Sequence, residues 1–183
     1  MNSVFIAGSR EILKLNPKIR ERLDNILKQN LTVLVGDANG ADKAVQKHLA
    51  KSRYPKVEVY CMDVCRNNVG NWQTHRYAAE PESKRDRHYY GIKDLAMARD
   101  ADCGFMLWDG KSKGTLANIV NLLNLGKKTL LYLSPKKQFL KLSSFEELEE
   151  VLHAIGFPDS FMMPKLLHTP KSVGNGLTPT LPG

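Results

Sequence analysis

The sequence predicts an α/β fold built on a single doubly wound parallel sheet of about five strands with flanking helices. Short apolar runs of strand length alternate along the chain with longer segments whose apolar residues recur at helical spacing. Strands separated by helices pair in parallel, because each helix returns the chain to the edge where the next strand begins. At 183 residues the chain is long enough for one such domain with a full apolar core.

The expected strands are short apolar runs that end in polar or glycine-rich turns. They cover residues 3–7, 31–35, 57–61, 103–108 and 128–133. The first expected helix follows Asn16 and Pro17, an N-cap and a proline at the first helical position. The remaining helices are expected over residues 41–49, 87–102, 116–125 and 145–155, the last of them after a capping-box pattern at residues 144–147.

Two segments carry no such pattern. Residues 66–86 form a polar stretch that is long for a loop of a compact domain, so we expect it to be functional or mobile. Trp72 within it is either the anchor of a lid or a ring that stacks on a base. Residues 158–183 are punctuated by proline and glycine without periodicity, so the expected domain spans residues 1–157 and precedes a flexible tail.

Composition narrows the possible partners. The formal net charge of +8 favours anionic partners such as nucleotides, nucleic acid or acidic surfaces. Three cysteines favour a reducing compartment over a disulfide framework. The N-terminus has no signal-peptide pattern, and no apolar run approaches the ~20 residues of a membrane helix. We therefore expect a cytoplasmic protein with no membrane partner.

A zinc site is one hypothesis for the cysteines. Cys61 and Cys65 could bind a metal together with His75 or His88, but their Cys-x3-Cys spacing is looser than that of structural zinc sites. Cys103 begins an apolar strand and is expected in the core. We therefore expect no metal and no cofactor.

Three loops are expected to converge on one ligand site. In an open parallel sheet, ligands bind beyond the carboxyl ends of the strands, where the strand order reverses. If the strand order is 3-2-1-4-5, the reversal lies between strands 3–7 and 103–108. The turns "GSR" and "WDGKSKGT" are then neighbours, with "GDANGAD" beside them.

The residue types in these loops suit an anionic, sugar-bearing ligand. Glycines allow the backbone to approach closely, and the helix that starts near Thr115 offers amides to a phosphate. Asp37 and Asp42 are acceptors for ribose hydroxyls, although Asp37 could act as a base and Asp42 could only complement a helix dipole. The expected ligand-binding residues are Gly8, Ser9, Arg10, Gly36, Asp37, Gly40, Asp42, Arg87, Asp109, Gly110, Lys113, Gly114, Thr115 and Asn118.

Four segments, taken in order, resemble the SLOG superfamily: "VFIAGSR", "VLVGDANGADKAV", "KDLAMARDADCGFMLWDGKSKGT" and "KTLLYL". This superfamily includes the Lonely Guy phosphoribohydrolases and DNA-processing protein A, and the chain most resembles its small DUF2493/YspA-like branch. The resemblance covers roughly residues 3–133. It implies a Rossmann-like fold that binds nucleotides or nucleotide-derived ligands, often as a homodimer.

The chain departs from the Lonely Guy enzymes at two catalytic positions. Those enzymes carry a "PGGxGTxxE" turn whose glutamate serves hydrolysis of the base–ribose bond, and the matching turn here places Asn118 at that position. The family's catalytic arginine falls at Lys93. Asparagine cannot act as a general base, and lysine lacks the bidentate fork of arginine.

Three functions follow from these patterns. The favoured one is a ligand-binding or sensor module for a nucleotide or phosphoribosyl ligand, expected to form a homo-oligomer. The second is an N-glycosidic hydrolase of nucleoside monophosphates, with Asp37, Lys93 or Asp109 among its catalytic groups. The third is a single-stranded nucleic-acid-binding protein, suggested by the net charge and the basic, aromatic run "KRDRHYY" at residues 84–90.

Overall fold

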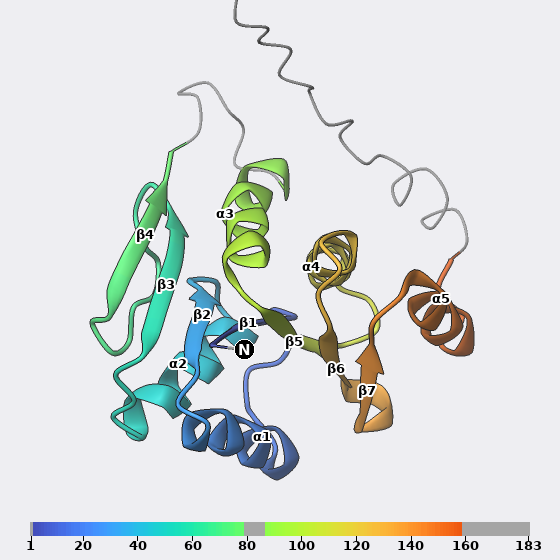
Figure 1. Cartoon of the computed structure of the whole chain (residues 1–183), viewed down its shortest axis with the longest axis horizontal. Coiled ribbons are helices and arrows are strands. Elements are labelled where there is room, and N and C mark those ends of the chain that lie inside the picture. Colours follow the sequence, from blue (N-terminus) through green and yellow to red (C-terminus); the bar gives the residue numbers. More distant parts are fainter. Residues whose placement is uncertain (1, 79–86, 159–183) are drawn as a thin grey trace, which may run out of the picture.

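The computed structural model describes residues 2–78 and 87–158 of the chain. In this part of the chain, seven strands form one sheet in the order β4-β3-β2-β1-β5-β6-β7 (Figure 1). Their bounds are β1 Ser3–Gly8, β2 Thr32–Gly36, β3 Val57–Met62, β4 Gln73–Tyr77, β5 Cys103–Trp108, β6 Thr129–Leu133 and β7 Gln138–Leu142. All neighbouring strands are parallel except β6 and β7.

The five central strands have the order that was assumed to place the ligand site, since β3-β2-β1-β5-β6 corresponds to 3-2-1-4-5. The predicted number of about five strands is too low, because each edge of the sheet carries a further strand. The sequence of β4, "QTHRY", is polar and lies inside the stretch expected to be a loop. The strand β7 follows β6 after a single helical turn, Ser134–Lys136. The short connection makes β7 antiparallel to β6 at this edge of the sheet.

Helices cover both faces of the sheet. Their bounds in the described residues are α1 Pro17–Lys28, α2 Ala41–Lys51, α3 Arg87–Asp100, α4 Lys113–Asn124 and α5 Phe145–Ala154. The helices α1 and α2 pack on one face, and α3, α4 and α5 pack on the other (Figure 1). Residues of β1 alternate between the two layers: Val4 and Ile6 join the first, Phe5 and Ala7 the second. A strand buried on both faces reads as a continuous apolar run, which is why the sequence predicts the central strands well.

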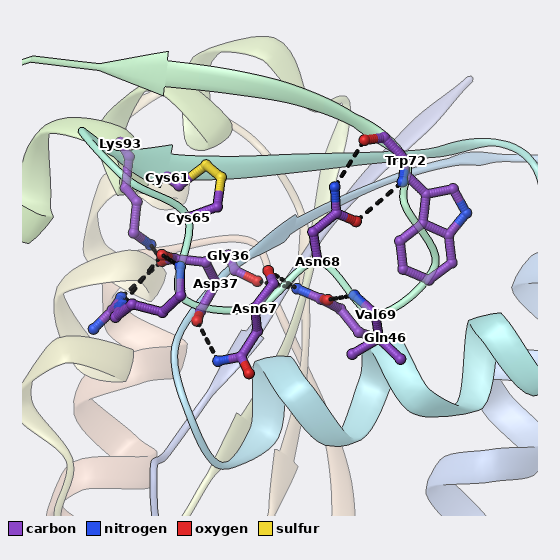
Figure 2. Close-up of a disulfide and its surroundings, with 11 residues drawn as sticks. Gly36, Asp37, Gln46, Cys61, Cys65, Asn67, Asn68, Val69, Trp72 and Lys93 are labelled. Atoms are coloured by element: carbon purple, nitrogen blue, oxygen red, sulfur yellow. Dashed lines mark hydrogen bonds and ion pairs between the residues drawn. A yellow bond between two sulfur atoms is a disulfide. The ribbon is translucent and has the colours of Figure 1, made fainter.

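The connection from β3 to β4 is an extended loop, residues 63–72, in place of a helix. Because β3 and β4 are parallel, this loop must return the chain to the edge of the sheet where β4 begins. Gln46 of α2 holds it by side-chain hydrogen bonds: it donates to the carbonyl of Asn67 at 3.2 Å and accepts from the amide of Val69 at 2.9 Å (Figure 2). A side chain of α2 therefore fixes the backbone of this loop.

Trp72 fixes the far end of the same loop. Its indole N–H donates to the carbonyl of Tyr54 at 2.9 Å. Asn68 also exchanges two hydrogen bonds with the backbone of Trp72 (Figure 2). Trp72 was expected either to anchor a lid or to stack on a base. Its hydrogen bonds within the protein support a role in anchoring this loop.

Cys61 and Cys65 form a disulfide at the start of the loop (Figure 2). Their Cα atoms lie 5.1 Å apart, within the range that disulfides span. The cysteine count favours a reducing compartment over a disulfide framework, and the Cys61–Cys65 disulfide departs from that expectation, whereas Cys103 is free. His75 contacts Glu58 at 2.9 Å, and no group of three or more His, Cys, Asp or Glu in the described residues could hold a metal ion.

Some of the expectations concern residues that the structure does not describe. Residues 79–86 and 159–183, which include most of the expected tail, lie outside the described residues. The side chains of Arg87 and His88 lie outside them as well. Within the described residues, no helix is long and apolar enough to cross a membrane.

Gly8 provides a test of how closely β1 packs against its neighbours. A Cβ at this position would lie 2.4 Å from the carbonyl oxygen of Leu107 and 2.8 Å from the Cβ of Ala41. We expect Gly8→Ala to lower the free energy of unfolding by about 2 kcal/mol, measured by chemical denaturation, since overpacking strains both contacts.

Gly91 in α3 is the matched control, because an added Cβ would meet no atom within 4 Å. We expect Gly91→Ala to raise the free energy of unfolding by about 0.5–1 kcal/mol through its helix propensity. Equal effects of the two substitutions would contradict the packing assigned to Gly8.

Candidate functional site

A cavity of about 630 Å³ opens at the carboxyl edge of the sheet, beyond the ends of β1 and β5. The strand order reverses between these two strands, which is where ligands bind in open parallel sheets. Pockets of roughly 300–1,000 Å³ accommodate small-molecule ligands. The predicted site residues that line the cavity are Gly8, Ser9, Arg10, Asp42, Lys93, Asp109, Gly114, Thr115 and Asn118.

The loops that follow β1 and β5 meet through side-chain and backbone contacts. The hydroxyl of Ser9 donates to the carboxylate of Asp109 at 2.8 Å. On the other side, the amide of Ala41 donates to the carbonyl of Ser9 at 3.1 Å. Gly40 makes this second junction possible, because its φ of 87° and its closeness to the backbone of Arg10 exclude a side chain. Gly40 therefore joins two loops and does not itself line the cavity.

The turn from Asp109 to Thr115 satisfies much of its own hydrogen bonding. The carboxylate of Asp109 accepts from the amides of Lys111 at 3.0 Å and Ser112 at 2.7 Å. Burial raises the pKa of Asp109, but these amide bonds outweigh it and hold the pKa below its ordinary value. Ser112 is the N-cap of α4 and accepts from the amide of Thr115. A phosphate could therefore reach fewer amides than the sequence suggests.

Gly114 lies in the first turn of α4 and lines the cavity, and the amides of a first helical turn favour an anion. An added Cβ at Gly114 would meet no atom within 4 Å. The exposed side chains of Arg10 and Lys111 line the same part of the cavity wall and bring positive charge.

Asp37, at the end of β2, is engaged by Arg66. The backbone amide, Nε and Nη2 of Arg66 donate to the two carboxylate oxygens of Asp37 at 3.0, 3.1 and 2.7 Å. Burial raises the pKa of Asp37, but the hydrogen bonds from Arg66 outweigh it and place the pKa below its ordinary value. Asp37 does not line the cavity at the switch point, so its carboxylate positions Arg66 instead of facing that space.

Lys93 and Asp42 form a buried charge group beside Gly36. A Cβ on Gly36 would lie 2.4 Å from Asp42 Oδ2 and 2.9 Å from Lys93 Nζ, which is why only glycine fits there. Lys93 Nζ donates to Asp94 Oδ1 at 2.8 Å and lies 3.9 Å from Asp37 Oδ1. Burial lowers the pKa of Lys93, but the charges of Asp94 and Asp42 outweigh it and raise the pKa above its ordinary value. Lys93 is therefore a cation at neutral pH.

Tyr90 and Arg66 are cavity residues that the set of expected binding residues lacks. The guanidinium of Arg66 lies 4.6 Å from the centre of the Tyr90 ring, and that of Arg10 lies 5.8 Å from it. Tyr90 belongs to the basic, aromatic run noted in the sequence, so its composition was a usable signal. Arg66 gave no such signal, because its role depends on the loop that places it over Asp37.

Three more of the expected residues, Gly36, Gly110 and Lys113, are not among the described residues that line this cavity. Gly110 and Lys113 face a smaller hollow beside Ile155 and Phe157. Gly36 lies behind Asp42 and Lys93, as described above, and the side chain of Arg87 is outside the described residues.

A wider hollow of about 810 Å³ lies near Trp72, at the amino ends of β2, β3 and β4. It is larger than the switch-point cavity, but it is more open and lies at the edge of the sheet opposite the convergent loops. We therefore place the candidate site at the switch point.

The fold and this cavity define the class of protein: an α/β protein with a ligand-sized site at the switch point of a mostly parallel sheet. No protein-family model matches the chain, and no curated protein matches it. The chain is similar in structure to DNA processing protein A from Helicobacter pylori, a structure that describes a single-stranded DNA binding mode. The TM-score is 0.54 at 15% identity, over 84% of this chain and 72% of that chain. This likeness shows a shared Rossmann-like fold.

The ionisation of Asp42 tests the buried charge group. Burial raises the pKa of Asp42 from 3.8 to about 6, while the charge of Lys93 acts in the opposite direction. We therefore expect the carboxyl carbon signal of Asp42 to titrate with a midpoint near pH 6 in carbon NMR. In Lys93→Met the midpoint should move upward, because the neighbouring cation is gone.

The sign of the effect on stability follows from the raised pKa. Between its unfolded and folded pKa values, the folded protein holds more protons at Asp42 than the unfolded chain does. The ionised Asp42 therefore lowers stability above pH 6, and this cost disappears as the pH falls from about 6 toward 4. Asp109, whose pKa lies below its ordinary value, is the internal control, because its titration should not change in Lys93→Met. A downward shift of the Asp42 midpoint in Lys93→Met would contradict the assignment of Asp42 to this charge group.

Proposed function

We propose that this protein binds a nucleotide or nucleotide-derived phosphorylated ligand in the switch-point cavity, as a ligand-binding or sensor module of the YspA-like branch of the SLOG superfamily. The observation that carries the proposal is a nucleotide-sized cavity at the switch point, lined by both basic and acidic side chains and by polar groups. Arg10, Lys111 and the amide of Gly114 supply an anion-binding rim. Asp42 and Asn118 supply hydrogen-bonding groups deeper in the same space.

An aromatic side chain completes the set of groups that a nucleotide requires. The half-buried ring of Tyr90 lines the cavity, and two guanidinium groups lie within 6 Å of its centre. A flat base can stack on such a ring or on a guanidinium plane. This arrangement supports a ligand that combines a phosphate with an aromatic base.

Hydrolysis of the base–ribose bond is the weaker alternative. Asn118 stands where the Lonely Guy enzymes carry a glutamate, and asparagine is no base. The carboxylates of Asp37 and Asp109 already accept three hydrogen bonds each and have lowered pKa values, which makes both poor bases. The geometry therefore favours binding without cleavage.

The absence of cleavage is directly measurable. Incubation of the protein with nucleoside 5′-monophosphates should leave the base attached, as followed by chromatography of the products. Asn118→Glu combined with Lys93→Arg restores both residue types of the Lonely Guy pattern and is the informative comparison. Rapid base release by the unmodified protein would show that it is an enzyme.

Single-stranded DNA is the second candidate ligand, favoured by the likeness to DNA processing protein A. The two candidates differ in their response to salt. Binding along a DNA backbone weakens steeply with salt, because each phosphate contact releases a counterion, with a log–log slope of about −0.7 per contact for single strands. Titration of oligo(dT) at several salt concentrations measures this slope.

Gly114→Val tests the cavity as the binding site. The substitution places a branched side chain at the rim without displacing any protein atom within 4 Å of the new Cβ. We expect the affinity for nucleoside 5′-monophosphates, measured by calorimetry, to fall by at least about tenfold, equivalent to ~1.4 kcal/mol. Asn124→Ala, at the opposite end of α4 from Gly114 and outside the cavity lining, should leave the affinity unchanged. Unaltered binding by Gly114→Val would place the ligand elsewhere.

A further inference from the structure

Two buried polar side chains on the floor of the cavity have unused hydrogen-bonding capacity. Asp42, on the first turn of α2, and Asn118, on α4, are each 5% exposed. Asp42 Oδ2 accepts from the amide of Ala38 at 3.3 Å, and no donor among the described residues bonds to Oδ1. The side chain of Asn118 makes no hydrogen bond to any described residue.

Among the described residues, Thr129 Oγ1 is the fully buried side-chain atom without a hydrogen-bond partner. The unpaired polar atoms of Asp42 and Asn118 therefore keep contact with the cavity, where a ligand or water can bind them. Both side chains line the cavity, which means that a bound molecule can reach them. The carboxylate and the amide come from helices on opposite faces of the sheet, and the switch point brings them to one space. Their convergence is therefore a property of the tertiary fold.

The charges at the floor determine which part of a ligand fits there. Asp42 lies beside Asp94 and the cation of Lys93, so the three groups together carry a net negative charge. A phosphate is repelled by this floor and is favoured at the rim, near the amide of Gly114. The buried part of the ligand is therefore uncharged and rich in hydrogen-bond donors.

The chemistry of the two side chains narrows the group further. A carboxylate only accepts hydrogen bonds, whereas an asparagine amide both donates and accepts. A hydroxyl does both as well, so a pair of neighbouring hydroxyls can donate to Asp42 and exchange hydrogen bonds with Asn118. The neighbouring 2′ and 3′ hydroxyls of a ribose have this pattern, and a 2′-deoxyribose lacks one of them.

We propose that Asp42 and Asn118 bind the ribose hydroxyls of the ligand, so that the cavity selects ribonucleotides over 2′-deoxyribonucleotides. This inference rests on the proposed nucleotide-binding function and specifies its ligand class. It also separates this chain from a protein that binds single-stranded DNA, because DNA has no 2′ hydroxyl to offer. Asp42 and Asn118 are then the residues that determine sugar specificity.

The test compares AMP, GMP, CMP and UMP with their 2′-deoxy counterparts by calorimetry. We expect the preferred ribonucleotide to bind at least about tenfold more tightly than its deoxy form, a difference of ~1.4 kcal/mol. Asp42→Asn and Asn118→Ala should each weaken ribonucleotide binding and bring the ratio of the two affinities toward one. Their effect on the deoxynucleotide should be smaller.

Matched controls exist on the same two layers of the fold. Asp24→Asn removes an exposed carboxylate on α1, and Asn124→Ala removes an exposed amide on α4. Both should leave the affinities and their ratio unchanged. Circular dichroism of each variant establishes that the fold is intact before binding is compared.

The possible outcomes distinguish this inference from the function on which it depends. Equal affinities for ribose and deoxyribose forms, or an unchanged ratio in both variants, overturn the sugar-binding assignment while nucleotide binding stands. Failure of every nucleotide to bind overturns both. Tighter binding of oligo(dA) than of oligo(rA) contradicts the inference and favours the DNA-binding function.

Discussion

The buried carboxylate of Asp37 is the point on which the architecture of one half of the molecule depends. It accepts three hydrogen bonds from Arg66 and thereby fastens the loop of residues 63–72 to the end of β2. That loop carries the chain to β4 without a helix and places the Arg66 guanidinium over Tyr90 at the cavity. Removing one partner of a buried ion pair leaves the other uncompensated, so this contact is costly to break.

The charged side chains around the cavity differ between its exposed part and its buried part. The exposed part of the lining carries Arg10 and Lys111 together with Glu11, while the buried part contains Lys93 among several carboxylates. In the interior, charges persist only when they are paired, and Lys93 with Asp94 and Asp42 meets that condition. A ligand that is anionic at one end and rich in hydroxyls at the other matches both parts of the cavity.

The likeness to DNA processing protein A establishes a common fold, and function depends on the site built on that fold. The turn after β5 illustrates the difference. In this chain Asp109 and Ser112 accept hydrogen bonds from the amides of Lys111, Ser112 and Thr115, so fewer amides of the turn can meet an anion. Local hydrogen bonds of this kind determine what a shared α/β scaffold can bind.

The sequence by itself determined the five central strands and, once the common order 3-2-1-4-5 was assumed, the meeting of the loops at the switch point. Strands buried on both faces are continuous apolar runs, whereas the strand order decides which loops are neighbours. Tertiary structure alone decided the roles of Arg66, Asp37 and β4. Polar edge strands and loops lack periodicity, and their hydrogen-bond partners are distant in sequence, as Arg66 is from Asp37. The partner of a buried charged side chain, such as Arg66 for Asp37, is therefore set by the packing between elements. No local sequence pattern encodes it.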